Sequence, residues 1–310
     1  MCGIVGYIGT CQAAPVLLDG LSKLEYRGYD SAGIAVYDGN KIQMQKAMGR
    51  LKVLEEMTQN GATLPGTVGI GHTRWATHGA PSDLNAHPHF NKDHSIVVVH
   101  NGIIENFQEL KEKLVKRGYT FYSETDTEVA VKLIDYYYKK TASPLSAIAT
   151  AMLHIRGSYA FGVLFKDYPD KLFAARKDSP LIIGKTAGAS LIASDVPAIL
   201  DQTRNVYYID NMEIAELSRD EIHFFNTDEE EIEKEMVEIN WDAEAAEKGG
   251  YEHFMLKEIN EQPTAVKTTI TPRITDSMPD FSAEGFDAAK LSSYNKIYIV
   301  ACGTAMHAGM

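Results

Sequence analysis

The chain has 310 residues, with 30 Lys and Arg against 42 Asp and Glu, and therefore a formal net charge of −12. This length predicts about two domains, and the excess of acid argues against nucleic acid or an anionic membrane as the main partner, because both bind basic surfaces. No apolar run reaches the roughly eighteen residues that cross a bilayer, and Cys2, Cys11 and Cys302 suit no disulfide framework. We therefore expect a cytoplasmic protein.

The first two-thirds of the chain is expected to form short strands joined by turns and a few helices. Apolar residues at helical spacing predict a helix over 107–118, and Thr125 with Glu128 fits a capping box that opens a second helix. Because the strands outnumber the helices and follow one another in meanders, two stacked sheets flanked by helices fit best. The predicted strands are 4–8, 33–37, 68–70, 95–99, 159–165, 172–175, 191–193 and 206–209.

The remaining third differs in composition. An acidic run at 228–231 is expected to be a solvated connector, and a helix beyond it is expected to be disturbed at Pro263. Residues 296–301 predict a buried strand, which needs neighbours on both sides. We therefore expect a first domain over 2–226, a connector over 227–290, and the truncated start of a second, α/β domain over 291–310.

Cys2 directly follows the initiator methionine. Removal of Met1 places a thiol beside a free α-amine, which titrates at about 7.7–8.0 and can accept the thiol proton. A cysteine at position two is more often incidental. Here Gly3 and Gly6 favour a nucleophile, because they let the backbone run close to a ligand.

The segment 71–79 follows a strand and contains Arg74, Trp75 and Thr77. The arginine offers a planar fork for a carboxylate, and the threonine adds a hydroxyl donor beside it. The tryptophan is a candidate plug for this loop. The alternative is an ordinary surface loop with a solvated arginine.

Asn101 and Gly102 follow another buried strand. This pair usually forms a turn, but an Asn amide and a Gly backbone N–H also build an oxyanion hole, in which each donor contributes about 3–4 kcal/mol to acyl transfer. Asp126 lies in the first turn of a predicted helix, where the helix dipole favours a carboxylate. It is also a candidate to hold an ammonium group.

Six histidines fall within thirty residues, but their spacing fits no metal motif. We interpret the loop over 85–89 as a rigid polar brace for the site, and no metal or organic cofactor is expected. The six are His72, His78, His87, His89, His94 and His100.

Together these motifs resemble the glutamine amidotransferases with an N-terminal cysteine nucleophile, and among them the glutamine–fructose-6-phosphate aminotransferase family. The resemblance implies an α+β fold, a four-layer αββα sandwich of the N-terminal-nucleophile (Ntn) hydrolase type, followed by the truncated start of an α/β sugar-isomerase domain. The segments that carry it are 24–33, 72–79, 100–106, 123–128 and 301–304.

The resemblance also implies a role for each matched residue. Cys2 attacks the glutamine amide and forms a thioester, while its α-amine acts as general base. The family's phosphate loop usually has Ser where this chain has Ala305. The other roles are the oxyanion hole (Asn101, Gly102), the substrate carboxylate site (Arg74, Thr77, His78), the substrate ammonium site (Asp126), the ammonia gate (Trp75), support of the site (Arg27, His87) and the sugar phosphate site (Cys302, Gly303, Thr304).

The function implied is release of ammonia from L-glutamine to aminate fructose 6-phosphate, giving glucosamine 6-phosphate, in a full-length enzyme expected to be a homodimer. One alternative is the glutaminase domain of amidophosphoribosyltransferase or asparagine synthetase. The segment 26–30 and the terminal 301–304 argue against it. The other is a non-catalytic sugar-phosphate sensor, which retention of Met1 would favour.

Overall fold

The computed structural model describes residues 2–240, 249–286, 288–301 and 303–310. Contacts divide the chain into two units, Met1–Ala246 and Glu247–Met310. The described residues include no helix that is long and apolar enough to cross a membrane.

Two antiparallel sheets form the centre of the first unit. The order of the first sheet is β15-β11-β9-β10-β1-β4-β2-β3, and that of the second is β14-β13-β12-β8-β7-β6-β5. The strands of the first sheet are β1 (Gly3–Gly9), β2 (Ser31–Tyr37), β3 (Ile42–Met48), β4 (Val68–Arg74), β9 (Ile182–Lys185), β10 (Ala189–Ala193), β11 (Asn205–Tyr208) and β15 (Val237–Glu238). Those of the second are β5 (His89–Phe90), β6 (Ile96–Ile104), β7 (Gly157–Phe165), β8 (Leu172–Lys177), β12 (Glu213–Leu217), β13 (Ile222–Asn226) and β14 (Glu231–Ile232).

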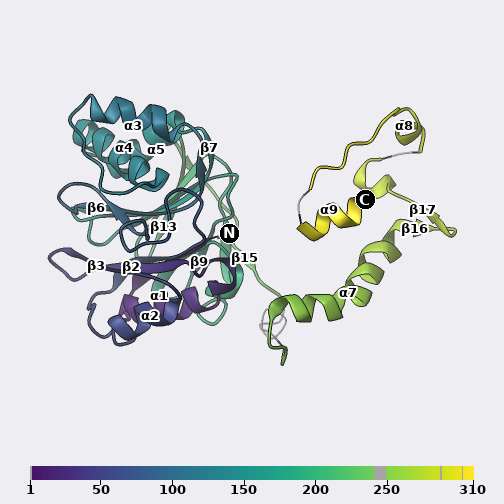
Figure 1. The fold of residues 1–310 in the computed structure, drawn as a ribbon, viewed down its shortest axis with the longest axis horizontal. Coiled ribbons are helices and arrows are strands. Elements are labelled where there is room, and N and C mark those ends of the chain that lie inside the picture. Colours follow the sequence, from purple (N-terminus) through teal and green to yellow (C-terminus); the bar gives the residue numbers. More distant parts are fainter. Residues whose placement is uncertain (1, 241–248, 287, 302) are drawn as a thin grey trace. The chain divides into compact units, whose positions relative to one another are not determined.

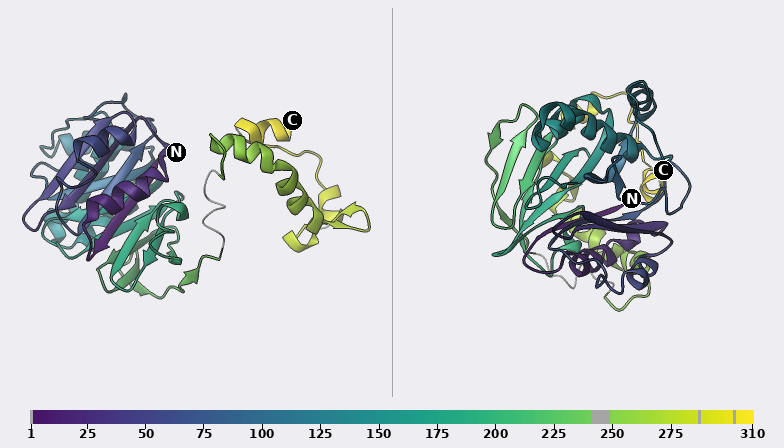
Figure 2. Two further views of the ribbon diagram at one scale, coloured as in Figure 1. Left: turned by 90° about the horizontal axis from the view of Figure 1, so that it is seen from below. Right: turned by 90° about the vertical axis from the view of Figure 1, so that its left-hand side faces the viewer.

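Helices cover the outer face of each sheet (Figures 1 and 2). On the first sheet α1 (Ala13–Ser22) and α2 (Leu51–Met57) bury residues such as Leu17 and Leu54. On the second sheet α3 (Phe107–Val115), α4 (Asp126–Thr141) and α5 (Pro144–His154) bury residues such as Ile134. Side chains of both sheets, among them Ile4 and Val99, form a third core between the sheets. These layers confirm the predicted αββα sandwich.

The central strand β1 is buried along its whole length between β4 and β10. Its first residue, Gly3, has no room for a side chain, since a Cβ there would lie 2.7 Å from both Leu24 Cβ and Thr73 Oγ1. The glycine therefore allows the start of β1 to pack closely against β4, and this packing positions Cys2.

All eight predicted strands overlap strands of the structure, and the predicted 107–118 helix is α3. The sequence interpretation missed the strands β3, β5, β9, β12, β13, β14 and β15, and the helices α1, α2 and α5. The acidic run at 228–231 is exposed, as expected, but it forms the turn of the β13–β14 hairpin. β14 and β15 are edge strands of the two sheets, so the sheets of the first unit extend beyond residue 226, the predicted end of the first domain.

The second unit contains α7 (Phe254–Ile270), a small hairpin of β16 (Ile274–Thr275) and β17 (Met278–Pro279), and two short helices, α8 (Ala288–Ser292) and α9 (Gly303–Gly309). The helix predicted to be disturbed at Pro263 runs through it to Ile270. Proline removes one backbone donor there, but the remaining turns are formed.

The buried strand predicted for 296–301 is wrong in this structure. Residues 296–301 form neither helix nor strand, and Ile297 and Val300 are 79% and 95% exposed. The physical reason is that no strand among the described residues pairs with this segment, and a strand of this type is stable only inside a sheet. Cys302 lies outside the described residues.

Candidate active site

Cys2 lies at the start of β1, next to the end of β4. Its Sγ atom accepts a hydrogen bond from the Trp75 backbone N–H at 3.3 Å and lies 3.5 Å from the Trp75 carbonyl oxygen. Burial raises the pKa of the Cys2 thiol, while the hydrogen bond from the Trp75 backbone opposes this rise. The thiol therefore needs a nearby base to become a nucleophile at neutral pH.

Asn101 approaches Cys2 from β6 in the opposite sheet. Its Nδ2 donates to the Cys2 carbonyl oxygen at 3.0 Å. The next residue, Gly102, has φ of +118°, and a Cβ there would collide with the Ser158 carbonyl oxygen. Only glycine fits this backbone, so the Asn101 amide and the Gly102 peptide both lie close to Cys2.

His72 fixes the orientation of the Asn101 amide. The His72 Nε2 atom lies 2.9 Å from the His100 carbonyl oxygen and 3.1 Å from Asn101 Oδ1. Both of these are acceptors, so Nε2 carries the proton and the Asn101 amino group is left to face Cys2. Burial lowers the pKa of His72 to about 3, which keeps the ring neutral.

Arg74 ends β4 and is only 3% exposed. Its Nη2 donates to the carbonyl oxygens of His78 and, at 2.9 Å, Gly79. Its Nη1 is buried and has no hydrogen-bond partner among the described residues. A buried guanidinium nitrogen without a partner is a donor suited to a carboxylate of a bound molecule.

Asp126 is the first residue of α4 and is buried. Its Oδ2 accepts a hydrogen bond from the Ile104 backbone N–H at 2.9 Å and lies 4.0 Å from His100 Nδ1. These contacts hold the carboxylate at the end of β6, close to Gly102.

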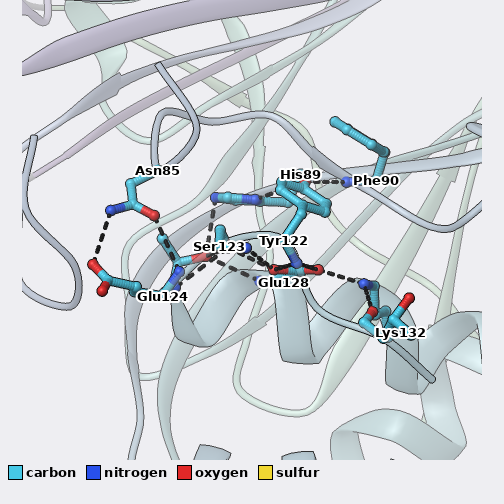
Figure 3. A network of polar contacts seen from close by, with 10 residues as sticks. Asn85, His89, Phe90, Tyr122, Ser123, Glu124, Glu128 and Lys132 are labelled. Carbon is cyan, nitrogen blue, oxygen red and sulfur yellow. Dashed lines mark hydrogen bonds and ion pairs between the residues drawn. The ribbon is translucent and has the colours of Figure 1, made fainter. Parts of the chain in front are cut away.

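The turn before α4 is held by Glu128 (Figure 3). The carboxylate of Glu128 accepts hydrogen bonds from the backbone N–H groups of Tyr122 and Ser123, at 2.9 and 2.6 Å, and pairs with Lys132. Thr125 caps the helix by accepting from the Glu128 N–H. The predicted capping box is therefore half right: Thr125 makes its bond, but Glu128 reaches past the cap residue to the two residues at 122 and 123.

Four of the histidines form a buried group beside the site. The rings of His72 and His87 stack with centroids 4.0 Å apart, and Thr127 Oγ1 lies 2.9 Å from His100 Nδ1. Burial lowers the pKa of His87, of His89 and of His100. No group of three or more side chains in the described part of the chain could hold a metal ion.

A small cavity connects most of these residues. Its volume is about 10 Å³, which is room for about one water molecule. It is therefore too small for an amino acid, and binding of a ligand of that size requires lining segments such as the loop after β4 to move. The lining residues are Cys2, Arg74, Trp75, Thr77, His87, His100, Gly102, Thr125, Asp126 and Thr127.

Within the first unit, His78 and Arg27 are predicted site residues that do not line this cavity. The ring of His78 packs edge-on against Phe107, so only its carbonyl oxygen meets Arg74. Arg27 pairs with Asp195. Gly303 and Thr304 begin α9 in the second unit, and Ala305 follows them there.

Comparison with known proteins identifies the class of this domain. A family profile described as a glutamine amidotransferase domain matches residues 72–201. Among solved structures, glutamine phosphoribosylpyrophosphate amidotransferase from B. subtilis superposes with a TM-score of 0.62 and 26% identity over 73% of this chain and 49% of that chain. The chain thus contains a glutamine amidotransferase domain with the Ntn-type fold.

Over its whole length the chain is homologous to proteins named glutamine–fructose-6-phosphate aminotransferase (isomerizing). It is 54% identical to that of Caldanaerobacter subterraneus subsp. tengcongensis and 53% identical to that of Clostridium acetobutylicum. In both cases all of this chain matches 51% of the relative. The chain spans about half the length of these curated relatives, and the resemblance noted from the motifs is confirmed.

Proposed function

We propose that this chain hydrolyses L-glutamine to glutamate and ammonia through a thioester on Cys2. The observation that carries the proposal is the convergence of Cys2, Arg74, Gly102 and Asp126 on one cavity, with the Asn101 amide 3.0 Å from the Cys2 carbonyl oxygen. A thiol, a pair of oxyanion donors, a cation and a carboxylate are the groups that acyl transfer from a free amino acid requires.

In the proposed reaction, removal of Met1 exposes the α-amine of Cys2. This amine accepts the thiol proton as sulfur attacks the glutamine side-chain carbonyl carbon. The negative charge that develops on the carbonyl oxygen is stabilised by the Asn101 Nδ2 and Gly102 N–H groups. The amine then returns the proton to the departing nitrogen, so ammonia leaves and a thioester remains. Water hydrolyses the thioester, giving glutamate and the thiol.

The charge pattern of the cavity supports a free amino acid as substrate. Arg74 holds the α-carboxylate, with Thr77 and the His78 segment beside it, and Asp126 holds the α-ammonium. A glutamine within a peptide carries neither charge, so it gains none of this binding energy. Trp75 is 45% exposed on the loop that must open, which supports a role as the gate. We assign Arg27 and His87 to support of the site: His87 stacks on His72, and Arg27 is held by its ion pair with Asp195.

The acceptor is proposed from the named relatives. Ammonia is transferred to fructose 6-phosphate in a cytoplasmic, homodimeric full-length enzyme, with residues 302–304 as part of the sugar-phosphate site. We expect this chain alone to release glutamate without activation by fructose 6-phosphate and to form no glucosamine 6-phosphate. Activation by the sugar phosphate, or any amino-sugar product, would contradict this assignment of the acceptor site.

The direct test of the proposal is a glutamate-release assay on the purified chain and on Cys2→Ala. We expect turnover by the first and none above background by the second, with equal thermal stability. Substantial turnover by Cys2→Ala would exclude the proposed nucleophile. An inactive chain that still binds fructose 6-phosphate would instead favour a non-catalytic sensor.

A further inference from the structure

A second pocket lies near the end of α4 opposite to Asp126. Its lining is rich in cations, whereas the chain as a whole is acidic. It has a volume of about 420 Å³, within the range of about 300–1,000 Å³ typical of small-molecule sites. Five of the nine lining residues are cationic in a chain whose net charge is −12. The lining residues are Lys92, Arg117, Gly118, Tyr119, Thr120, Lys132, Tyr136, Lys139 and Lys140.

The sequence of α4 explains why these cations gather. Lys132, Tyr136, Lys139 and Lys140 are spaced at i, i+4, i+7 and i+8, which places them on one face of a helix. Arg117, just after α3, adds a fifth side chain to the wall. The pocket is therefore built by the packing of α3 on α4, within the first unit.

The carboxylates nearby neutralise only part of this charge. Glu128 pairs with Lys132, and Asp135 with Lys139. Within the described residues, Lys92, Arg117 and Lys140 have no carboxylate at ion-pair distance. Asp93 is a third carboxylate, and the charge of Lys139 helps to lower its pKa. The pocket therefore has five cations against three carboxylates.

Two of these cations are crowded around one phenol. The Arg117 guanidinium lies 4.7 Å and the Lys140 ammonium 4.1 Å from the centre of the Tyr136 ring. Hydrogen bonding to Lys140 and the charge of Arg117 lower the pKa of this half-buried tyrosine. Cations that line one pocket repel one another, and a bound anion relieves the repulsion.

We propose that this pocket is a binding site for a small metabolite that carries a diphosphate or triphosphate group. Arg117 offers a planar fork to one phosphate, while Lys92 and Lys140 supply point charges for the next. Lys132, which is buried and paired with Glu128 (Figure 3), also lines the pocket. A single phosphate would meet too few of these separated cations to bind as well. This proposal does not depend on the glutaminase activity.

The test is isothermal titration calorimetry of the chain with pyrophosphate at low salt, compared with inorganic phosphate. We expect one pyrophosphate per chain, weaker binding of phosphate, and affinity that falls as salt is raised. Arg117→Gln and Lys140→Gln should each weaken pyrophosphate binding by about tenfold, the loss expected for a charge-assisted contact. Both side chains are exposed, so these variants should fold. Lys132 is left intact because it supports the turn before α4.

The matched control is Lys52→Gln, whose side chain is 81% exposed on α2 and far from the pocket in sequence. It should bind pyrophosphate like the unmodified chain, and Lys92→Gln, on a different segment of the pocket, should repeat the loss. The proposal is overturned if pyrophosphate does not bind, if the double variant Arg117→Gln/Lys140→Gln binds it unchanged, or if phosphate binds as tightly.

Discussion

The Nε2 atom of His72 lies 3.1 Å from Oδ1 of Asn101, and this contact joins the two sheets directly behind the proposed nucleophile. His72 is fully buried on β4, and Asn101 comes from β6. Because the histidine N–H is a donor, the amide oxygen must face it, and the amide N–H groups face Cys2. The orientation of the proposed oxyanion donor therefore depends on a residue that touches no substrate.

Replacement of His72 by Leu should lower kcat for glutamine hydrolysis by about tenfold, the value of one lost orienting hydrogen bond, with little change in KM. His72→Gln, which can still donate to Oδ1, should recover part of kcat. Steady-state kinetics with thermal melts separates this from a packing role. If both variants lose stability but keep kcat, His72 is only a core residue.

Asn101→Ala should lower kcat by about two to three orders of magnitude, because the donor is most important when charge develops on the substrate oxygen. Asn101→Asp, of similar size but without the donor, should fall as far. Asn40→Ala, in the exposed β2–β3 turn, is the control and should remain active. A change confined to KM would assign Asn101 to ground-state binding instead.

Arg74→Ala should raise KM for glutamine strongly, with a loss of about 2–4 kcal/mol of binding for a buried charged pair. Arg219→Ala, at an exposed turn, is the matched control and should leave KM unchanged. The measurement is the glutamate-release rate across glutamine concentrations. An unaltered KM in Arg74→Ala would mean that the carboxylate is bound elsewhere.

Acid should destabilise the first unit before the carboxylates titrate. The pKa of His72 falls from 6.5 to about 3 on folding because the ring is buried. Between these pH values the unfolded chain binds more protons than the folded one, so stability is complete above about pH 6.5 and decreases as pH falls toward 3. For His72 the full loss is at most about 5 kcal/mol. Thermal melts between pH 7.5 and 5 should show this decrease, with a shallower slope in His72→Gln; equal slopes would contradict the buried neutral ring.

The sequence predicted the strands and helices that have a clear local pattern of apolar residues. It did not predict features that depend on contacts between residues far apart in the chain. The strands around Cys2 and Asn101 have strong apolar patterns, and the motifs around them match a known family. The roles of His72 and Glu128 could not be predicted, since each acts on a residue brought to it by a separate element. The available signal for His72 was its spacing from Arg74, because residues two apart on one strand lie on the same face. The 296–301 strand failed for the opposite reason, because its apolar pattern is strong but no described strand pairs with it.

The central claim, that Cys2 with a free α-amine is the nucleophile, is tested most directly by mass spectrometry of the chain after reaction with a diazoketone analogue of glutamine. The account predicts that Met1 is absent, that one label is attached per chain at Cys2, and that excess glutamine prevents the labelling. Cys11, an exposed free thiol, is the internal control and should stay unmodified. Retention of Met1, or labelling at Cys11 with Cys2 untouched, would contradict the account.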